Sequence, residues 1–393
     1  MTSALRVGID ASNLRRGGGR THLIELLQAA DPAAHGFERL VVWGSRETLA
    51  LLPERDWLLR RQPPALEAGL WRRALWQRRQ LSLEAEAEGC NLLLVPGGLF
   101  PGQFRPAVVM CRNMLPFEWR ELLRYGCSLT TLRLLLLRRA QAQAFRRAEG
   151  VVFLSRYASE HVQAITGALA GESEIISHGL NHRFLQPPRP QRPIEAYDAA
   201  NPYRILYVSI IDVYKHPWHL VAAVGRLRQR TGWPLVLELA GPAHGPSLRR
   251  LQAAVGRWDP GHDWVTLHGA VAYEALDRLY AAADLGAFAS SCENMPNILL
   301  ETMASGLPVV SSDRGPMPEI LGDSGLYFDP EDPESIERSL HKCIADPRLR
   351  QALARDSHAV AQQHTWRRCA DRTFAFLRRV ALAHPRLSGR CAA

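Results

Sequence analysis

Lysine is nearly absent from this sequence of 393 residues, although the chain carries a formal net charge of +9. Among its 48 basic residues only Lys215 and Lys342 are lysines, and the others are arginines. Residues 1–200 hold 26 Arg against 19 Asp and Glu, so most of the excess positive charge lies in the first half. A basic half of this kind predicts an anionic partner, either a nucleic acid, an anionic membrane surface or an anionic substrate.

The sequence also lacks a run of roughly eighteen apolar residues, so no membrane-spanning helix is expected. The polar residues after Met1 are not typical of a signal peptide. The seven cysteines are scattered without a C-x-x-C pair, which indicates reduced thiols rather than a disulfide framework or a zinc site. These absences predict a cytoplasmic protein, and the Arg- and Ala-rich composition is typical of a bacterial one. A peripheral position at the inner face of the cytoplasmic membrane is the alternative.

Length and patterning predict an α/β protein with two domains, because 393 residues with 47% apolar content suffice for two separate cores. Strand-like runs alternate with helical patterns in both halves, as in β-α units around a parallel sheet. The expected domains are an N-terminal one at 1–187 and a C-terminal one at 203–365. A Pro-rich linker is expected at 188–202 and a last helix at 366–384.

Residues 285–308 predict a strand, a tight loop and a helix. Pro296 and Gly306 are typical start and stop signals, so the helix is expected from Pro296 to Ser305. Its first N–H groups, near Asn297 and Ile298, suit a phosphate or a sugar hydroxyl.

Two carboxylates, Glu293 and Glu301, belong to this loop and helix. On a single helix they would be about 12 Å apart along the axis, farther than the roughly 5 to 9.5 Å of a glycosidase pair. With the helix beginning at Pro296, Glu293 lies in the loop and Glu301 more than one turn inside the helix. The two are then placed to hold the two ends of one hydroxyl-rich ligand. The alternative is that Glu293 is a surface loop residue and Glu301 a solvated helix residue.

Two further positions are candidates for binding phosphate. Lys215 follows a nearly continuous apolar strand, and open α/β sheets bind ligands at the carboxyl ends of their strands. A compact ammonium there suits a phosphate. Near the N-terminus, Gly17, Gly18 and Gly19 follow the first strand and let the backbone approach a ligand closely. They lack the G-x-G-x-x-G spacing of a dinucleotide site, so a plain flexible turn is the alternative.

Glu293, the seven residues after it, Glu301 and the following MASGLPVVSSDRGPMPEIL closely resemble the signature of the retaining glycosyltransferases of the GT-B fold, family four, also called glycosyl transferases group 1. The resemblance implies two Rossmann-like domains facing a central cleft, with the C-terminal helix returning to the N-terminal domain. It also implies transfer of a hexose from a nucleotide-diphosphate sugar to a glycan or lipid-linked glycan, with retention of configuration. Bacterial surface polysaccharide or lipopolysaccharide synthesis is the expected setting. No Asp-x-Asp motif is present, which fits a reaction without a metal, and no other cofactor is expected.

The resemblance also assigns roles to residues of the second half. Lys215 would bind the diphosphate, Glu301 the ribose hydroxyls, and Glu293 the sugar, either as a nucleophile or as an orienting group. The remaining donor-binding positions would be Gly241, His268, Gly269, Met295, Asn297 and Ile298.

Acceptor binding is expected in the first half, at Gly17, Gly18, Gly19, Arg20, Arg112 and Asn113. Family members often have a His near the acceptor side of the sugar, where this chain has Arg112 and Asn113. They also commonly have an Arg five residues before the diphosphate-binding Lys, where this chain has Ile210. One diphosphate contact is therefore missing or comes from another residue, such as Arg20 or Arg314.

Two Arg-rich segments, 58–80 and 129–147, are expected to form basic amphipathic helices. They either lie on anionic lipid headgroups or present solvated Arg faces over a Leu core. A GT-B-like sugar-nucleotide epimerase or phosphorylase is a rival interpretation, as is a non-catalytic protein that binds nucleotide sugars or nucleic acid. The chain has no recognisable nucleic-acid-binding module, so no nucleic-acid partner is expected.

Overall fold

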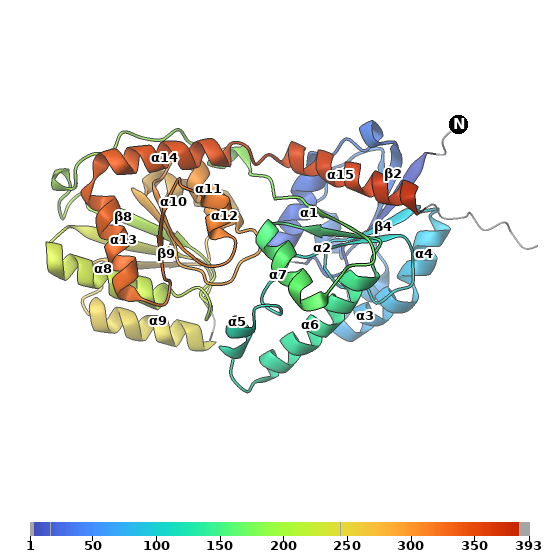
Figure 1. The fold of residues 1–393 in the computed structure, drawn as a ribbon, viewed down its shortest axis with the longest axis horizontal. Helices are drawn as coiled ribbons and strands as arrows, with labels where there is room; N and C mark the ends of the chain where they lie inside the picture. Colours follow the sequence, from blue (N-terminus) through green and yellow to red (C-terminus); the bar gives the residue numbers. More distant parts are fainter. Residues whose placement is uncertain (1–3, 16, 244, 385–393) are drawn as a thin grey trace, which may run out of the picture. The chain divides into compact units, whose positions relative to one another are not determined.

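A computed structural model describes residues 4–15, 17–243 and 245–384 and divides the chain into two compact units (Figure 1). Unit 1 comprises Met1–Phe117, Ser128–Gly179 and Thr365–Ala393, and unit 2 comprises Glu118–Cys127 and Leu180–His364. Each unit is built on a parallel sheet whose strands are connected through helices. The predicted α/β class with two Rossmann-like units is therefore confirmed.

The sheet of unit 1 has seven strands in the order β3-β2-β1-β4-β5-β6-β7. β1 pairs in parallel with both β2 and β4, so the strand order reverses between β1 and β4. Ligands of open α/β sheets bind beyond the strand ends at such a reversal. The strands are β1 Leu5–Asp10, β2 Phe37–Trp43, β3 Leu58–Arg61, β4 Leu92–Val95, β5 Ala107–Met110, β6 Gly150–Phe153 and β7 Glu172–Ile175.

The helices of unit 1 include the last helix of the chain, α15, which packs against α1. The His22 ring of α1 lies 5.3 Å from the Trp366 ring of α15, centroid to centroid. The predicted return of the C-terminal helix to the N-terminal unit is thus confirmed. The helices are α1 Gly18–Gln28, η1 Ala33–His35, α2 Arg46–Leu49, η2 Pro64–Leu66, α3 Leu70–Arg79, α4 Leu81–Ala87, α6 Leu129–Arg147, α7 Arg156–Thr166 and α15 Trp366–Ala383.

The sheet of unit 2 has six strands in the order β10-β9-β8-β11-β12-β13, again all parallel. Its order reverses between β8 and β11, the two strands that precede Lys215 and Glu293. The strands are β8 Tyr203–Val208, β9 Leu235–Ala240, β10 Val265–Gly269, β11 Leu285–Phe288, β12 Val309–Ser312 and β13 Leu326–Phe328.

The helices of unit 2 surround this sheet, and α11 packs on β11 and α14. Leu299, Leu300 and Met303 of α11 are fully buried, so this short helix is fixed by its apolar side chains rather than by helix propensity. The helices are α5 Trp119–Leu123, η3 His182–Phe184, η4 Ile194–Ala196, α8 Pro217–Thr231, α9 Gly245–Trp258, η5 Tyr273–Ala275, α10 Leu276–Ala282, α11 Asn297–Ala304, α12 Met317–Leu321, α13 Pro333–Ala345 and α14 Pro347–Ala361.

Two segments differ from the sequence-based expectation. The stretch 58–80 is not one amphipathic helix, because Leu58–Arg61 pairs with β2 as an edge strand and only Leu70–Arg79 forms an α-helix. The Pro-rich stretch 188–202 lies within unit 2 and is bonded to it. The buried Arg350 of α14 donates to the Arg192 carbonyl, and Arg189 donates to the Ala281 carbonyl at 2.8 Å.

Candidate active site

The carboxyl ends of β8 and β11 carry an ion pair between Lys215 and Glu293. The Lys215 Nζ contacts the Glu293 carboxylate directly, and Lys215 is only 6% exposed. Its ammonium also lies 5.0 Å from the centre of the Tyr214 ring. The two residues that the sequence placed on separate loops are therefore neighbours. The alternative in which Glu293 is a plain surface residue is wrong, because its side chain is 15% exposed and paired.

A second set of hydrogen bonds joins the loops that carry these two residues. Ser291 N donates to the Tyr214 carbonyl at 2.8 Å, and Ser291 Oγ lies 2.8 Å from His216 Nε2. His216 has φ 48°, a left-handed conformation that costs a non-glycine residue about 1–2 kcal/mol. Burial and the neighbouring Arg124 lower the pKa of His216 to about 3, so its ring is neutral. These contacts fix the Lys215 loop against the Glu293 loop.

Helix α11 begins directly after the Glu293 loop, with Pro296 as its N-cap. The first intrahelical bonds run from the Leu299 and Leu300 amides to the Pro296 carbonyl, at 3.1 and 3.3 Å. The amides of Asn297 and Ile298 come before these bonds, so they are not used within the helix. The positive end of α11 and the Lys215 ammonium thus belong to the same edge of the sheet, where both favour an anion.

Glu301 lies one turn further along α11 and is 3% exposed. Tyr273 donates its hydroxyl to Glu301 Oε1 at 3.1 Å, and Tyr280 donates to Oε2 at 3.5 Å. Burial raises the pKa of Glu301 to about 7, against the lowering effect of these hydrogen bonds and of Arg183. The alternative in which Glu301 is a solvated helix residue is therefore wrong. A buried carboxyl near half ionisation at neutral pH is typical of a ligand-binding or catalytic group.

The other donor-binding candidates of unit 2 lie on several loops. Gly241 has φ 148°, and a Cβ at this position would overlap the Ser209 carbonyl, so only glycine fits there. Met295 is buried between Glu293 and α11. His268 and Gly269 end β10, and His268 Nε2 pairs with Glu238 at 2.9 Å. Within the described part of the chain, His268 bonds Glu238 and makes no hydrogen bond or ion pair with Lys215 or Glu301.

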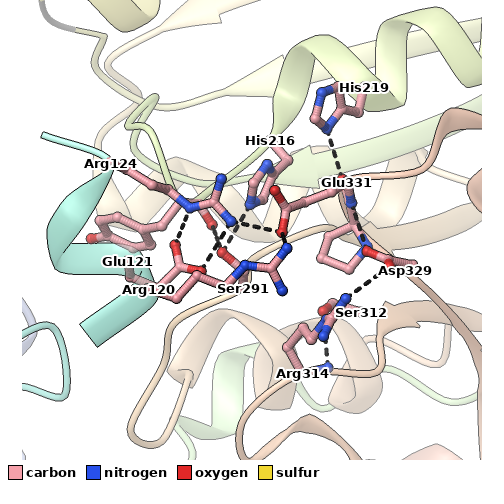
Figure 2. A network of polar contacts seen from close by, with 12 residues as sticks. Arg120, Glu121, Arg124, His216, His219, Ser291, Ser312, Arg314, Asp329 and Glu331 are labelled. Atoms are coloured by element: carbon pink, nitrogen blue, oxygen red, sulfur yellow. Dashed lines mark hydrogen bonds and ion pairs between the residues drawn. The ribbon is translucent and has the colours of Figure 1, made fainter. Parts of the chain in front are cut away.

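A network beside the ion pair includes residues that the sequence did not single out (Figure 2). Arg124 lies between Glu121 and Glu331, with both distances 2.7 Å, and Arg120 also pairs with Glu331 at 2.9 Å. Burial and the nearby Asp212 of the Lys215 loop raise the pKa of Tyr125. Residues 118–127 therefore cover this part of unit 2, although the chain on either side of them belongs to unit 1.

The acceptor candidates lie in unit 1, where the structure joins two of them. Arg112, just after β5, donates from Nη2 to the Gly18 carbonyl at 2.8 Å. Gly17 is the N-cap of α1, which begins at Gly18 and contains Gly19. Asn113 is exposed and accepts a hydrogen bond from the Leu115 amide at 3.1 Å.

The two arginines considered as substitutes for the missing diphosphate contact have carboxylate partners. Arg20 Nη1 lies 2.5 Å from Glu47 Oε1, and Arg314 Nη2 lies 2.7 Å from Asp329 Oδ2. The side chain at Ile210 is 45% exposed and carries no charge. In the structure neither arginine therefore offers an unpaired charge for this role.

Within the described ranges, no group of three or more His, Cys, Asp or Glu residues is arranged to hold a metal ion.

Comparison with known proteins shows which protein family the segment around these residues resembles. The family model described as "Glycosyl transferases group 1" matches residues 202–346, which include Lys215, Glu293 and Glu301. The chain is 27% identical over 237 residues to "O-antigen chain mannosyltransferase B" of Escherichia coli, covering 58% of this chain and 57% of that protein. The chain spans about half the length, or less, of the curated relatives it matches first.

Solved structures resemble the chain over nearly its whole length. Sucrose-phosphate synthase from Thermosynechococcus elongatus superposes with a TM-score of 0.75 at 19% identity, covering 96% of this chain and all 100% of that one. HepE from Anabaena in complex with UDP and glucose gives a TM-score of 0.67 at 19% identity, covering 94% and 98%. At such identities the likeness shows the fold alone, and that fold is GT-B.

Proposed function

We infer that this chain, whose residues 202–346 form a group 1 glycosyl transferase domain within a GT-B fold, moves a hexose from a nucleoside diphosphate sugar to a glycan or lipid-linked glycan. The observation that carries the proposal is the Lys215–Glu293 pair beside the N-terminus of α11, with buried Glu301 on the same helix. The HepE structure in complex with UDP and glucose supports a nucleotide-sugar donor.

The proposed reaction uses charges that the protein already holds in place. The bond between the sugar C1 and the diphosphate oxygen breaks, and Lys215 and the α11 amides stabilise the charge that develops on the diphosphate. The acceptor oxygen bonds to C1 and gives its proton to the departing phosphate oxygen. Glu293 orients the sugar or acts on it directly, and Glu301 accepts hydrogen bonds from the ribose hydroxyls.

Replacement of the paired residues tests this assignment. Lys215→Ala and Glu293→Ala are expected to lower turnover more than 100-fold, in the range seen for lost charge-stabilising groups. Both variants should remain folded by circular dichroism, at a lower melting temperature because each leaves one charge of a buried pair without its partner. Matched controls are Lys342→Ala, at the only other lysine, and Glu195→Ala, both at exposed positions of unit 2. Sugar transfer at the wild-type rate by Lys215→Ala and Glu293→Ala would defeat the proposal.

The donor is to be found by a thermal-shift screen of nucleotide sugars, because a ligand that binds only the folded state raises the melting temperature. Products formed with the stabilising donor then separate the rival activities. An epimerase converts the donor without an acceptor, a phosphorylase uses inorganic phosphate, and a binding protein forms no product.

Two finer features of the reaction are also proposals, namely retention of the anomeric configuration and independence from a metal. NMR of the product's anomeric proton tests the first, and inversion would refute it. A rate that is unchanged by EDTA and by added Mg²⁺ or Mn²⁺ would support the second. An EDTA-sensitive rate that is restored by a metal would refute it.

The proposed setting is bacterial surface polysaccharide or lipopolysaccharide synthesis in the cytoplasm. The E. coli relative, which is named an O-antigen chain mannosyltransferase, supports this setting. Transfer to saccharides isolated from lipopolysaccharide, compared with transfer to storage glucans, tests it directly.

A peripheral membrane position is proposed from the surface of unit 1. Helices α3 and α6 contain many arginines and no Asp or Glu, yet they expose large apolar side chains. Trp71 is 87% exposed and Leu129 is 86% exposed. None of the helices within the described ranges has the length and apolarity to span a bilayer. Salt-sensitive pelleting with anionic vesicles, lost in Trp71→Ala combined with Leu129→Ala, is the expected result, and equal pelleting with neutral vesicles would count against it.

A further inference from the structure

The carboxylate of Glu301 is held by a cluster of aromatic rings that also carries a cation. Tyr273 and Tyr280 donate their hydroxyls to its two oxygens, at 3.1 and 3.5 Å. The fully buried Phe184 ring lies against both tyrosine rings, with centroid distances of 5.6 and 5.7 Å. The guanidinium carbon of Arg183, which precedes Phe184, lies 3.9 Å from the centre of the Tyr273 ring. The cation therefore lies on the ring whose hydroxyl bonds the carboxylate.

The charge of Arg183 is not taken up by another carboxylate. Within the described ranges Arg183 forms no ion pair, and its buried Nε and Nη2 have no hydrogen-bond partner. Buried donors are nearly always bonded, so an arginine in this state calls for an explanation. Its contact with Tyr273 supplies one, because a guanidinium stacks favourably on the electron-rich face of an aromatic ring.

The segment that carries Arg183 is fixed to helix α11. The Gln186 amide donates to the Ala304 carbonyl at 3.0 Å, and Ser305 Oγ donates to the Phe184 carbonyl at 3.4 Å. These two bonds join the residues just after Arg183 to the end of α11. The guanidinium is therefore held at a defined place relative to the helix that carries the carboxylate.

Two effects of this cation favour the ionised form of Glu301. An opposite charge nearby favours ionisation directly, and a cation over the ring makes the Tyr273 hydroxyl a stronger donor to the carboxylate. Burial raises the pKa of Glu301 to about 7, while the Tyr273 bond, the Arg183 charge and the Tyr280 bond each lower it. Burial and the charge of Glu301 raise the pKa of Tyr273, so its hydroxyl keeps the proton that it donates.

The other elements around α11 bring little charge to Glu301. α11 itself has no second titratable residue, and β11, which packs on it, has the apolar sequence LGAF. From α14, His358 bonds a carbonyl at the end of α11, at 3.0 Å. Asp277 and Arg278 of α10 form no ion pair in the part of the chain that the structure describes. Arg183 is therefore the cation whose charge acts on this carboxylate.

We propose that Arg183 is a positioning residue of the donor site, which acts through the Tyr273 ring to keep the Glu301 carboxyl in the ionised form that accepts hydrogen bonds from the ribose hydroxyls. The inference rests on the proposed function and deepens it, because it couples donor binding to the loss of a proton from Glu301 to solvent. A protonated carboxyl accepts fewer hydrogen bonds than a carboxylate. Donor affinity should therefore rise with pH through neutrality and become constant above it.

Calorimetric titration with UDP, GDP and ADP from about pH 5.5 to about pH 9 tests the proposal, and the nucleotide that the wild type binds serves as the probe. Arg183→Met should bind it about threefold to tenfold more weakly at about pH 7 and with wild-type affinity at about pH 9, because loss of the cation moves the titration of Glu301 to higher pH. Arg183→Lys keeps the charge and should restore most of the wild-type profile. Arg278→Met, at an exposed arginine of α10, is the matched control and should follow the wild type.

The shape of the pH profile distinguishes a positioning residue from a structural one. Affinity that is reduced equally at every pH in Arg183→Met would show that Arg183 only supports the fold, and a profile identical to that of the wild type would show that its charge has no effect. Either result would overturn the proposal. Tyr273→Phe removes the hydroxyl and should also move the profile to higher pH, so an unmoved profile in this variant would refute the path through the ring.

Urea unfolding without nucleotide separates this inference from the proposed function. The stability that Glu301 contributes at low pH should be lost at higher pH in Arg183→Met than in the wild type, and this pH dependence should disappear when Glu301→Gln is added. If none of the nucleotides binds the wild type, the proposed function fails. The unfolding experiment still decides on Arg183 in that case, because an unmoved pH dependence in Arg183→Met would refute its effect on Glu301.

Discussion

The contact between β11 and α11 offers a sharp test of how the site is held, because these elements flank the Glu293 loop and one of them carries Glu301. Gly286 of β11 lies directly under Thr302 of α11, and a Cβ at Gly286 would overlap the Thr302 Cγ2 methyl. Ordinary carbon contacts are about 3.5–4.0 Å. Thr302 cannot rotate freely to make room, because its Oγ1 donates to the Ile298 carbonyl at 2.7 Å. Gly286→Ala is therefore expected to lower the free energy of unfolding by about 1–3 kcal/mol, the usual cost of overpacking a core.

A second substitution should restore part of the stability that Gly286→Ala removes. Thr302→Ser removes the overlapping methyl and keeps the hydroxyl, and the Cβ of residue 302 would then be 3.5 Å from the methyl carbon introduced by Gly286→Ala. Alone, Thr302→Ser is expected to cost about 1 kcal/mol for the lost buried methyl. In combination the two changes should cost about 1–2 kcal/mol less than the sum of the single effects. Nucleotide affinity should follow the same pattern, because the clash displaces α11.

Urea unfolding followed by tryptophan fluorescence measures these free energies. Gly256→Ala is the matched control, because a Cβ at this position in α9 would meet nothing within 4 Å. It should raise stability by about 0.4–1 kcal/mol through the more restricted unfolded chain. Strictly additive effects of Gly286→Ala and Thr302→Ser would refute the packing argument.

Three further predictions concern charge, strain and burial. Burial raises the pKa of Glu301 from 4.5 to about 7, so the stability that this group contributes is fully present below about pH 4.5 and is lost as pH rises through 7. Over this pH range the free energy of unfolding of the wild type should fall by about 3 kcal/mol relative to that of Glu301→Gln, measured by urea unfolding at several pH values. His216→Gly removes the left-handed strain and the bond to Ser291 together, so the melting temperature should change little while nucleotide affinity, measured by calorimetry, falls about threefold to tenfold. Arg350→Met should lower the free energy of unfolding by about 3–5 kcal/mol in the urea assay, because it leaves the buried Cys343 and Ile344 carbonyls at the end of α13 unsatisfied. A pH-independent difference for Glu301→Gln, unchanged affinity in His216→Gly, or wild-type stability in Arg350→Met would contradict the respective argument.

The sequence alone predicted the site correctly where local turn and helix signals agree with the order of the strands in the sheet. Pro296 as a helix start and Gly306 as a helix stop predicted the ends of α11 to within one residue. Both residues limit the helix through their own backbone conformations, which do not depend on contacts with distant parts of the chain. Lys215 and Glu293 were each predicted at a strand end, and they meet because their strands are neighbours in a parallel sheet. Neighbouring parallel strands bring their carboxyl ends to one edge, so strand-end positions carry information about the site.

Features that depend on contacts distant in sequence escaped the prediction. The sequence Leu-Leu-Arg-Arg at Leu58–Arg61 has no period that separates a helix from an edge strand, and only its pairing with β2 decides between them. The placement of 118–127 in unit 2 depends on ion pairs of Arg120 and Arg124 with Glu331, more than 200 positions away. Tyr273 and Tyr280, which bond Glu301, were missed as well. Tyr273 lies in η5 and Tyr280 in α10, so only the folded turn between them brings both hydroxyls to Glu301.

The two lysines of this arginine-rich chain show how composition and position together identify a site. Lys342 is exposed on α13, where an arginine would serve equally well. Lys215 is almost fully buried, and its ammonium pairs with Glu293 and lies 5.0 Å from the centre of the Tyr214 ring and 5.9 Å from that of the Phe288 ring. A planar guanidinium is wider and presents several donors that need fixed acceptors around it, whereas an ammonium is a compact charge that can pair with one carboxylate. The compact ammonium therefore suits this buried position beside Glu293 better than the guanidinium that the chain carries at nearly all its other basic positions.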